Sequence, residues 1–385
     1  MKILIISSSR ADYDLLYPVV LELKKEKIEY DFLITGSHLT KKFSSDNNNF
    51  KENKIKKKFL KISLKKNNSI FVFTDAMKKF NLFLNKNKPD LLLVLGDRFE
   101  IFSIVLSAAF KKIPIAHISG GELTVANLDD SIRHSITKFS HFHFVANNIY
   151  KKRVIQLGEN PKTVFVTGGT GIDNIKKNYF YNKNQLENLL SFKFKRYNFI
   201  VTYLPVSYLD KKKSNKNEIK IILSSLCSFK NSNIFVTYPN IDEGSDEIID
   251  IIKKFKKRYN NIKVFKYLGK EKYLSILKNF DCLIGNSSSG ITEAPFLKIP
   301  TINIGERQKG RVKALSIIDC EAKKELIIKN IKIALTNKFK NKIARQKTYY
   351  GKGNSSQKIV KILQQISLKN ILKKNFYDIA SKKYE

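Results

Sequence analysis

The feature that most constrains the fold is an unbroken apolar segment at residues 91–95, which is followed at once by Gly96, Asp97 and Arg98. The segment is too short for an ordinary helix and is bounded by Pro89 and Gly96, so it predicts a strand buried on both faces, as in a parallel α/β sheet. In open sheets of this kind, ligands bind beyond the carboxyl ends of the strands. Asp97 and Arg98 are therefore candidate site residues.

The next predicted strand is also followed by small and polar residues, which end in Glu122. Two neighbouring strand ends thus bring carboxylates to the same edge of the sheet. The helix predicted next carries Asp129 and Asp130 near its start. Arg133 and His134 follow them at the i,i+4 spacing that places side chains on one helix face, so these four residues join the candidate site.

The chain has 385 residues, which is too long for one ordinary core and predicts two domains. Strand and helix signals alternate from the first residue, so the predicted fold class is α/β, with two doubly wound Rossmann-type domains. The glycine-dense segment 168–171 separates the two series. We expect an N-terminal domain over residues 1–172, a C-terminal domain over 173–352, and a C-terminal helix near 353–385 that packs back on the first domain.

Individual elements follow from the same patterns. The predicted strands are residues 2–6, 30–35, 91–95, 142–146 and 164–166 in the first half, and 197–203, 233–238, 262–265, 282–284 and 301–304 in the second. The predicted helices are residues 75–85, 101–110, 151–157, 218–229, 246–259, 270–279, 290–296 and 355–372. Residues 41–68 are rich in Lys and Asn, and predict a mobile excursion with at most a short strand near 59–62.

The formal net charge of +38 raises the alternative of a nucleic-acid-binding protein, because a basic surface attracts polyanions. The excess is nearly all Lys and is spread along the chain with Asn and Ile, without an Arg-rich patch interleaved with aromatic residues. Such uniform enrichment favours a biased coding composition, with weak steering of an anionic substrate as the alternative. We therefore predict no nucleic-acid partner.

The sequence also bears on the compartment. No apolar run has membrane-spanning length, and the N-terminal segment lacks the longer apolar core and cleavage site of a signal peptide. Cys227, Cys282 and Cys320 lack the spacing of a disulfide framework or a zinc site. These observations predict a cytoplasmic protein with no membrane partner.

In the second half, residues 285–293 follow a predicted strand and open a predicted helix. Backbone N–H groups at such a helix start, with hydroxyls from Ser287 and its neighbours, form a site for a phosphate or diphosphate. Glu293 suits a bidentate contact with ribose hydroxyls, and Arg307 or Arg311 could clamp the same phosphates. The alternative is a helix that is simply capped after a tight turn.

Further polar residues follow the other predicted strands of the first half, with Arg10 and Asp12 after the first strand and His38 after the second. Each has a simple structural alternative, since Asp97 could cap a helix and His38 could lie in an ordinary loop. Their convergence on one edge of the sheet favours a site. Carboxylates gathered there raise some of one another's pKa values, which allows acid and base roles near neutral pH.

Taken together, these motifs resemble the hydrolysing UDP-N-acetylglucosamine 2-epimerases over about residues 3–311. The motifs that carry the resemblance are, in chain order, Arg10-Ala-Asp-Tyr, Gly36-Ser-His-Leu, Gly96-Asp-Arg-Phe-Glu, His117-Ile-Ser-Gly-Gly-Glu, Asp129-Asp-Ser-Ile-Arg-His-Ser-Ile-Thr-Lys, Arg153-Val-Ile-Gln-Leu-Gly-Glu-Asn-Pro, Tyr238-Pro-Asn-Ile-Asp, Gly285-Asn-Ser-Ser-Ser-Gly and Arg307-Gln-Lys-Gly-Arg.

The resemblance implies a GT-B-like architecture with the active site in the cleft between the domains, and it implies that the C-terminal domain, residues 173–352, binds UDP. It also implies conversion of UDP-N-acetylglucosamine and water to UDP and N-acetylmannosamine, the entry to sialic-acid-type sugars. A sister group that this chain resembles equally acts on UDP-2,4-diacetamido-2,4,6-trideoxyglucose and feeds legionaminic-acid-type sugars. A GT-B glycosyltransferase, a non-hydrolysing epimerase and an inactive sugar-nucleotide-binding protein remain as alternatives.

In the implied mechanism, a base removes the proton at C2 while UDP leaves C1, and water then adds to the resulting 2-acetamidoglucal. The catalytic candidates for these steps are Asp97, Glu122 and Asp129. The substrate-binding candidates are Arg10, Asp12, His38, Arg98, Asp130, Arg133, His134, Asn240, Ser287, Ser288, Glu293 and Arg307. The scheme predicts no cofactor and no metal, and we expect a homo-oligomer.

The chain departs from the family pattern at two positions. Many members carry Glu where this chain has Ser119, which leaves Glu122 to serve as the acid. The family usually has His before Pro at the start of the second domain, where this chain has Leu204. Leucine can neither transfer a proton nor hydrogen-bond, so we expect reduced activity, an altered substrate, or rescue by a neighbour such as Tyr203.

Overall fold

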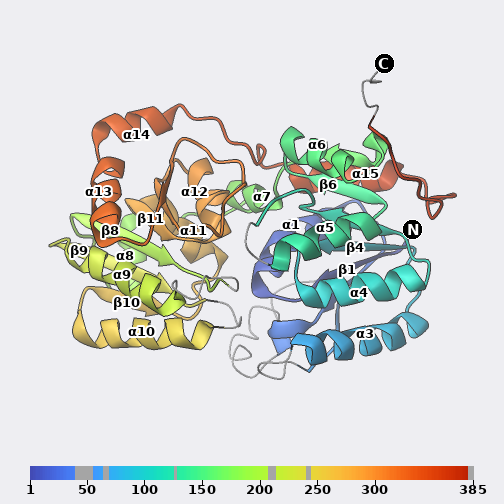
Figure 1. Cartoon of the computed structure of the whole chain (residues 1–385), viewed down its shortest axis with the longest axis horizontal. Helices are drawn as coiled ribbons and strands as arrows, with labels where there is room; N and C mark the ends of the chain where they lie inside the picture. Colours follow the sequence, from blue (N-terminus) through green and yellow to red (C-terminus); the bar gives the residue numbers. More distant parts are fainter. Residues whose placement is uncertain (40–54, 64–68, 125–127, 207–213, 240–243, 380–385) are drawn as a thin grey trace, which may run out of the picture. The chain divides into compact units, whose positions relative to one another are not determined.

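The computed structural model describes residues 1–39, 55–63, 69–124, 128–206, 214–239 and 244–379. The chain divides into two compact units. Unit 1 contains Met1–Glu122, Asp129–Asn174 and Tyr350–Glu385, and unit 2 contains Leu123–Leu128 and Ile175–Tyr349. Figure 1 shows that each unit is a sheet covered by helices. The domain boundaries expected from the sequence stay a prediction.

Unit 1 is built on a parallel sheet that has, among the described residues, seven strands in the order β3-β2-β1-β4-β5-β6-β7. The strands are β1 (Ile3–Ser7), β2 (Tyr30–Ile34), β3 (Lys57–Phe59), β4 (Leu91–Leu95), β5 (Ile115–Ile118), β6 (Phe142–Val145) and β7 (Val164–Val166). The helices are α1 (Arg10–Lys25), α3 (Ser69–Lys86), α4 (Phe99–Phe110), α5 (Leu128–Phe139), α6 (Asn148–Gln156), α7 (Thr170–Lys176) and α15 (Ser355–Gln365), with the 3₁₀ turns η1 (Gly36–Leu39) and η3 (Pro161–Thr163).

The two central strands of this sheet, β1 and β4, are buried along their whole length. Ile3 and Ile5 of β1 pack on one face with side chains of α1 and α15, whereas Leu4 and Ile6 pack on the other face with side chains of α3 and α4. Because helices cover both faces, every residue of these strands is apolar except the last one of β1, Ser7. The strand order reverses between β1 and β4, so the residues that follow them lie at the switch point where open α/β sheets bind ligands.

Unit 2 repeats this design. Its sheet has, in the part of the chain that the structure describes, six parallel strands in the order β10-β9-β8-β11-β12-β13. They are β8 (Tyr197–Thr202), β9 (Ser232–Thr237), β10 (Ile262–Phe265), β11 (Cys282–Gly285), β12 (Thr301–Ile304) and β13 (Ile317–Cys320). The helices are α8 (Lys183–Leu190), α9 (Asn215–Cys227), α10 (Ser245–Arg258), α11 (Lys270–Asn279), α12 (Glu293–Phe296), α13 (Lys324–Ala334) and α14 (Asn337–Ala344), with the 3₁₀ turn η4 (Ser288–Gly290). The prediction of an α/β fold with two doubly wound parallel sheets is confirmed.

Helix α15 returns the end of the chain to unit 1. Its side chains Ile359 and Leu363 are buried in the same apolar cluster as Leu16 and Val20 of α1. Asp173, which is fully buried, caps the start of α15, because its carboxylate accepts hydrogen bonds from the Ser355 and Ser356 backbone N–H groups at 2.9 and 2.6 Å. A carboxylate far away in the sequence thus completes this helix.

Some elements differ from the expectation. Strand β13 and helices α13 and α14 were not predicted, and the last helix ends at Gln365 instead of residue 372. Of the excursion at residues 41–68, the structure describes 55–63. There β3 begins two residues before the strand expected near 59–62 and shares only Phe59 with it. The rest of the excursion lies outside the described residues. Within the described ranges, no helix combines the length and the apolar character needed to cross a membrane.

Candidate active site

The turn between β1 and α1 places Asp12 at the switch point of unit 1. Ser9 is the N-cap of α1, and its hydroxyl accepts a hydrogen bond from the Asp12 backbone N–H at 3.3 Å. The Asp12 carboxylate in turn accepts a hydrogen bond from the Ser8 hydroxyl at 2.9 Å. Burial raises the pKa of Asp12, while the positive charge of Arg98 acts in the opposite direction. Asp12 is therefore a buried and oriented carboxyl group near a cation.

His38 lies at the same edge of the sheet. It is buried in η1, directly after β2, and its Nε2 atom hydrogen-bonds the Ser7 hydroxyl at 2.9 Å. The ring also meets Tyr13 edge-on, with 6.0 Å between ring centroids. These contacts hold the imidazole against the end of β1.

The side chain of Arg133 joins two of the catalytic candidates. Its Nη2 group donates to the Asp97 carboxylate, and its Nη1 group donates to the Glu122 backbone carbonyl at 3.0 Å. Arg133 is only 2% exposed and Glu122 only 6%. Arg133, which was expected to bind substrate, therefore donates hydrogen bonds to two loops of the protein.

A sharp turn after β5 brings Glu122 to the rim. Ser119 and Gly121 both have left-handed backbone angles, with φ of 69° and 76°. A Cβ atom on Gly121 would lie 2.6 Å from the Tyr150 backbone oxygen, so only glycine permits this close approach to α6. Arg153 of α6 also donates to the Gly121 carbonyl, which fastens the turn to the helix.

Arg98 forms an ion pair with Glu100 that was not predicted from the sequence. Its Nε and Nη2 groups donate to the two carboxylate oxygens of Glu100 at 3.2 and 3.1 Å. Glu100 is buried in the first turn of α4, so the pair is held at the end of β4. A carboxylate two residues after an arginine, at a helix start beyond a buried strand, is the signal that could have identified Glu100.

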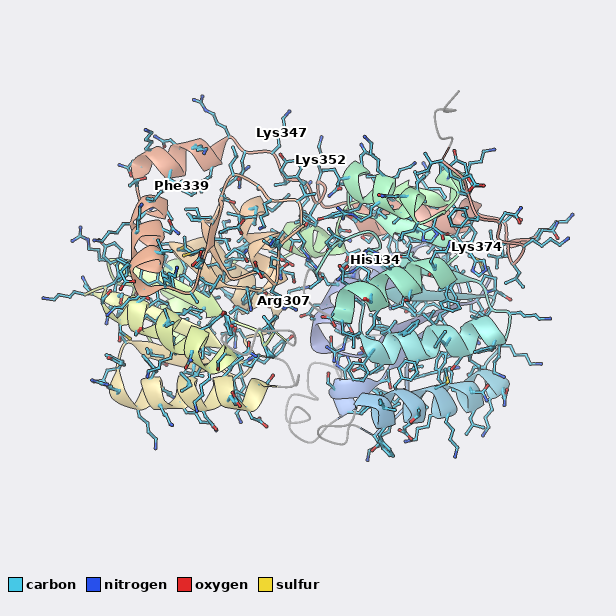
Figure 2. The ribbon with its side chains drawn as sticks, viewed as in Figure 1. His134, Arg307, Phe339, Lys347, Lys352 and Lys374 are labelled. Carbon is cyan, nitrogen blue, oxygen red and sulfur yellow. The ribbon has the colours of Figure 1, made fainter. Side chains whose placement is uncertain are left out.

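The start of α5 supplies the remaining polar residues of unit 1. Asp129 and Asp130 lie in its first turn. The predicted pairing of Asp130 with His134 is present, since His134 Nε2 lies 3.5 Å from the Asp130 carboxylate. Burial lowers the pKa of His134, although Asp130 opposes this effect. Figure 2 labels His134 on α5.

In unit 2, the side chain of Asn286 organises the edge of the sheet. Its amide oxygen accepts from the Leu204 backbone N–H at 2.7 Å, and its amide nitrogen donates to the Leu204 carbonyl at 2.8 Å. The Asn286 backbone carbonyl accepts from the Gln308 side chain at 2.9 Å and from the Arg307 guanidinium at 3.2 Å. The segments after β8, β11 and β12 are thereby joined, with Arg307, labelled in Figure 2, among them.

The serine-rich segment after β11 differs from the expected helix at residues 290–296. It forms the short turn η4, in which Ser288 is exposed and the Ser287 hydroxyl accepts from the Ser289 N–H at 3.3 Å. The one-turn helix α12 follows. Because the macrodipole depends on aligned peptides over several turns, a phosphate here would be bound by hydroxyls, N–H groups and Arg307.

Two further contacts complete this edge of unit 2. The Thr292 hydroxyl donates to the Glu293 carboxylate, and burial raises the pKa of Glu293. The Tyr273 hydroxyl donates to the Ser289 hydroxyl at 2.8 Å, and burial raises the pKa of Tyr273 to about 12. Tyr273 therefore supports the serine turn as a neutral hydrogen-bond donor.

The position usually held by histidine in the family is occupied by the half-buried Leu204, just beyond β8. Its neighbour Tyr203 is buried in the core, and its hydroxyl donates to Glu218 at 2.7 Å. Burial raises the pKa of Tyr203 far above its usual value. These contacts argue against the suggested rescue by Tyr203.

The predicted residues whose side chains are described fall into two sets, one in each unit. Asp12, His38, Asp97, Arg98, Glu122, Asp129, Asp130, Arg133 and His134 lie in unit 1, and Ser287, Ser288, Glu293 and Arg307 lie in unit 2. Arg10 is the first residue of α1, but its side chain lies outside the described part of the chain, as does all of Asn240. The catalytic and binding roles stay predictions.

The side-chain contacts of Asn286 and Tyr273 were not predicted from the sequence. Asn286 was within the glycine–serine motif, but its side-chain contact with Leu204 joins positions 82 residues apart. Tyr273 carries no local signal, since its partner Ser289 lies on another element. Within the described residues, no group of three or more His, Cys, Asp or Glu side chains is arranged to hold a metal ion. The expectation that the protein needs no metal or cofactor stays a prediction.

The chain is similar to known proteins over nearly its whole length. Residues 21–364 match the family described as UDP-N-acetylglucosamine 2-epimerase. The chain is 39% identical to the Campylobacter jejuni protein named GDP/UDP-N,N'-diacetylbacillosamine 2-epimerase (hydrolyzing), covering 98% of this chain and 99% of the relative. It is 38% identical to polysialic acid biosynthesis protein P7 of Escherichia coli, covering 98% of this chain and 97% of that protein.

A solved structure gives the corresponding result for the fold. The crystal structure of UDP-GlcNAc 2-epimerase from Neisseria meningitidis bound to UDP-GlcNAc superimposes with a TM-score of 0.82 and 21% identity, covering 95% of this chain and all of that one. The similarity confirms the predicted fold class, which is GT-B-like and has two parallel-sheet domains.

Proposed function

Because the chain belongs to the UDP-N-acetylglucosamine 2-epimerase family, we propose that it is a hydrolysing UDP-sugar 2-epimerase that converts UDP-N-acetylglucosamine and water to N-acetylmannosamine and UDP. The observation that carries this proposal is the buried Arg133 guanidinium in unit 1, which joins the Asp97 carboxylate to the backbone carbonyl of Glu122. Serine hydroxyls and Arg307 in unit 2 are suited to a diphosphate.

In the proposed reaction, one of the unit 1 carboxylates removes the proton from C2. The C1–O bond to UDP breaks, the electron pair leaves with the diphosphate, and a C1=C2 double bond forms. Water then adds, so that its hydroxyl bonds to C1 and a proton returns to C2 on the opposite face. Asp97, Glu122 and Asp129 are the proposed acids and bases, because this chemistry needs carboxyl groups within hydrogen-bond reach of C2 and of the water.

A second candidate substrate is UDP-2,4-diacetamido-2,4,6-trideoxyglucose. The observation that favours it is the 39% identity to the Campylobacter jejuni protein named GDP/UDP-N,N'-diacetylbacillosamine 2-epimerase (hydrolyzing), since N,N'-diacetylbacillosamine is this diacetamido sugar. The two substrates share the 2-acetamido group and the UDP leaving group on which the elimination depends. Use of UDP-N-acetylglucosamine would place the protein in the synthesis of sialic-acid-type sugars, and use of the diacetamido sugar nucleotide would place it in the synthesis of legionaminic-acid-type sugars.

Both substrates can be tested side by side in deuterated water, with the products followed by NMR. We expect release of UDP and of the free 2-epimeric sugar, with one deuterium at C2, because the returning proton comes from solvent. A nucleotide-linked epimer as product would indicate a non-hydrolysing epimerase. Transfer to an added acceptor would indicate a glycosyltransferase, and bound UDP without turnover would indicate a binding protein.

We also propose that the protein forms a homo-oligomer through α4. The outward side chains of this helix include Phe102, Leu106 and Phe110, and Phe110 is 83% exposed. Phe73 and Phe139 extend the apolar surface, with ring centroids 5.9 and 6.3 Å from that of Phe102. Helix α4 contains no Lys or Arg, although the chain has 72 of them. Two like-charged copies repel least where lysines are absent, which favours a second copy as the partner.

The pair of substitutions Leu106→Lys and Phe110→Lys is expected to convert the oligomer to a monomer, because it places charges in the apolar interface. Light scattering after size-exclusion chromatography measures the mass. Ile149→Lys is the matched control, since Ile149 is exposed on α6 outside this surface. An unchanged mass for the double variant would refute an interface at α4.

The proposed location is the cytoplasm. All three cysteines, Cys227, Cys282 and Cys320, are free thiols, the state that reducing compartments maintain. The predicted absence of a nucleic-acid partner remains to be tested. Weak binding to mixed-sequence DNA that disappears at physiological salt would agree with it.

A further inference from the structure

The guanidinium of Arg133 forms hydrogen bonds with two loops of the protein. The side chain is 3% exposed, and its two terminal nitrogens reach two different loops, the one after β4 through Asp97 and the one after β5 through the Glu122 carbonyl. An arginine is well suited to such a role, because its planar group presents several donors in a fixed geometry.

A second chain of hydrogen bonds links the same helix to the same loop. His117 Nε2 bonds to the Gly96 carbonyl at 2.8 Å, and His117 Nδ1 bonds to the Thr137 hydroxyl at 3.1 Å. Burial lowers the pKa of His117 to about 3, so the imidazole is neutral. A carbonyl can only accept, so Nε2 carries the proton, and the Thr137 hydroxyl shares its single proton between His117 Nδ1 and the Arg133 backbone carbonyl, which lies at 3.0 Å. Helix α5 thus holds Gly96 and Asp97 through two independent contacts.

We propose that Arg133 is a positioning residue for the elimination step: it fixes the orientation of the Asp97 carboxylate and its spacing from the Glu122 loop, and it does not bind the sugar nucleotide. This inference rests on the proposed function. Charge-assisted hydrogen bonds are strong and directional, and a catalytic carboxylate displaced by about 1 Å loses about a hundredfold in rate.

The test compares Arg133→Gln and Arg133→Lys with the wild type. Arg133→Gln is expected to lower kcat about a hundredfold, with KM little changed, because the base is misoriented while the substrate contacts remain. Arg133→Lys should lose about tenfold, because one ammonium cannot reach both loops with the geometry of a guanidinium. In Arg133→Gln, the acid limb of the kcat–pH profile should move to higher pH, because the cation that favours the carboxylate is gone.

Lys138→Gln is the matched control on the same helix. Lys138 pairs with Glu159 at 2.8 Å, away from Asp97, and its loss should leave kcat near that of the wild type. UDP titration of each variant reports whether the protein is folded. Arg133→Gln with unchanged kcat and a raised KM would overturn the positioning role alone. Wild-type protein that turns over neither sugar nucleotide would overturn the proposed function, and this inference with it.

Discussion

Replacing Asp97 by Asn, Glu122 by Gln or Asp129 by Asn is expected to lower kcat by about a hundredfold or more, because each change removes a group that transfers a proton while keeping its shape. Affinity for UDP should stay within about twofold of the wild type, since these residues are assigned to the sugar. Steady-state kinetics and isothermal titration with UDP measure the two quantities separately.

Variants of unit 2 provide the opposite pattern. Arg307→Ala is expected to weaken UDP binding by about 1–3 kcal/mol, the usual effect of losing a charge-assisted hydrogen bond to a phosphate. Ser287→Ala should act in the same direction by a smaller amount. If Glu122→Gln turned over like the parent enzyme, the proton-transfer role assigned to Glu122 would be wrong, and the chemistry would rest on Asp97, Asp129 or another residue.

A second large effect is expected at position 204, where Leu204→His should raise kcat by about tenfold to a hundredfold. The backbone of this residue is already held on both sides by Asn286, at 2.7 and 2.8 Å. An imidazole placed there would start from a fixed position at the end of β8, and it could donate, accept or transfer a proton, which leucine cannot do.

The gain should follow the titration of an imidazole, near about pH 6.5 if its pKa is unperturbed. Leu204→Phe is the control, because it adds a ring of comparable size without a titratable nitrogen. An equal gain from Leu204→Phe would attribute the effect to shape, and no gain from Leu204→His at any pH would show that this chain has no use for a histidine at position 204.

Much of the fold was predictable from local patterns. The segment 91–95 could only be a strand covered on both faces, because five apolar residues cannot form a stable helix and leave no polar face for water. The observed strand β4 has the same bounds. The polar residues that follow it had to lie at the carboxyl edge of a parallel sheet, so Asp97 and Glu122 could be nominated before any coordinates were known.

Contacts between distant segments were not predictable in this way. Spacing alone placed Arg133 on the same helix face as Asp129, but nothing local could show that its guanidinium bonds to Asp97, 36 residues away, and to the Glu122 carbonyl. Likewise, Tyr203 was a plausible substitute for the missing histidine until its hydroxyl was found directed at Glu218 in the core. The same holds for Asp173, which caps a helix 182 residues later.

The physical reason is the range of the interactions. Helix and strand formation depends on the side chains within a few residues, so the amino-acid sequence by itself determined the alternation of strands and helices and the residues at the strand ends. The partner of a buried charge depends on which side chains packing brings within about 3 Å, and this requires the order of the strands and the direction of every side chain. Only the tertiary structure therefore decided that Arg133 bonds to the loops that carry Asp97 and Glu122, and that Asn286 holds Leu204 in place.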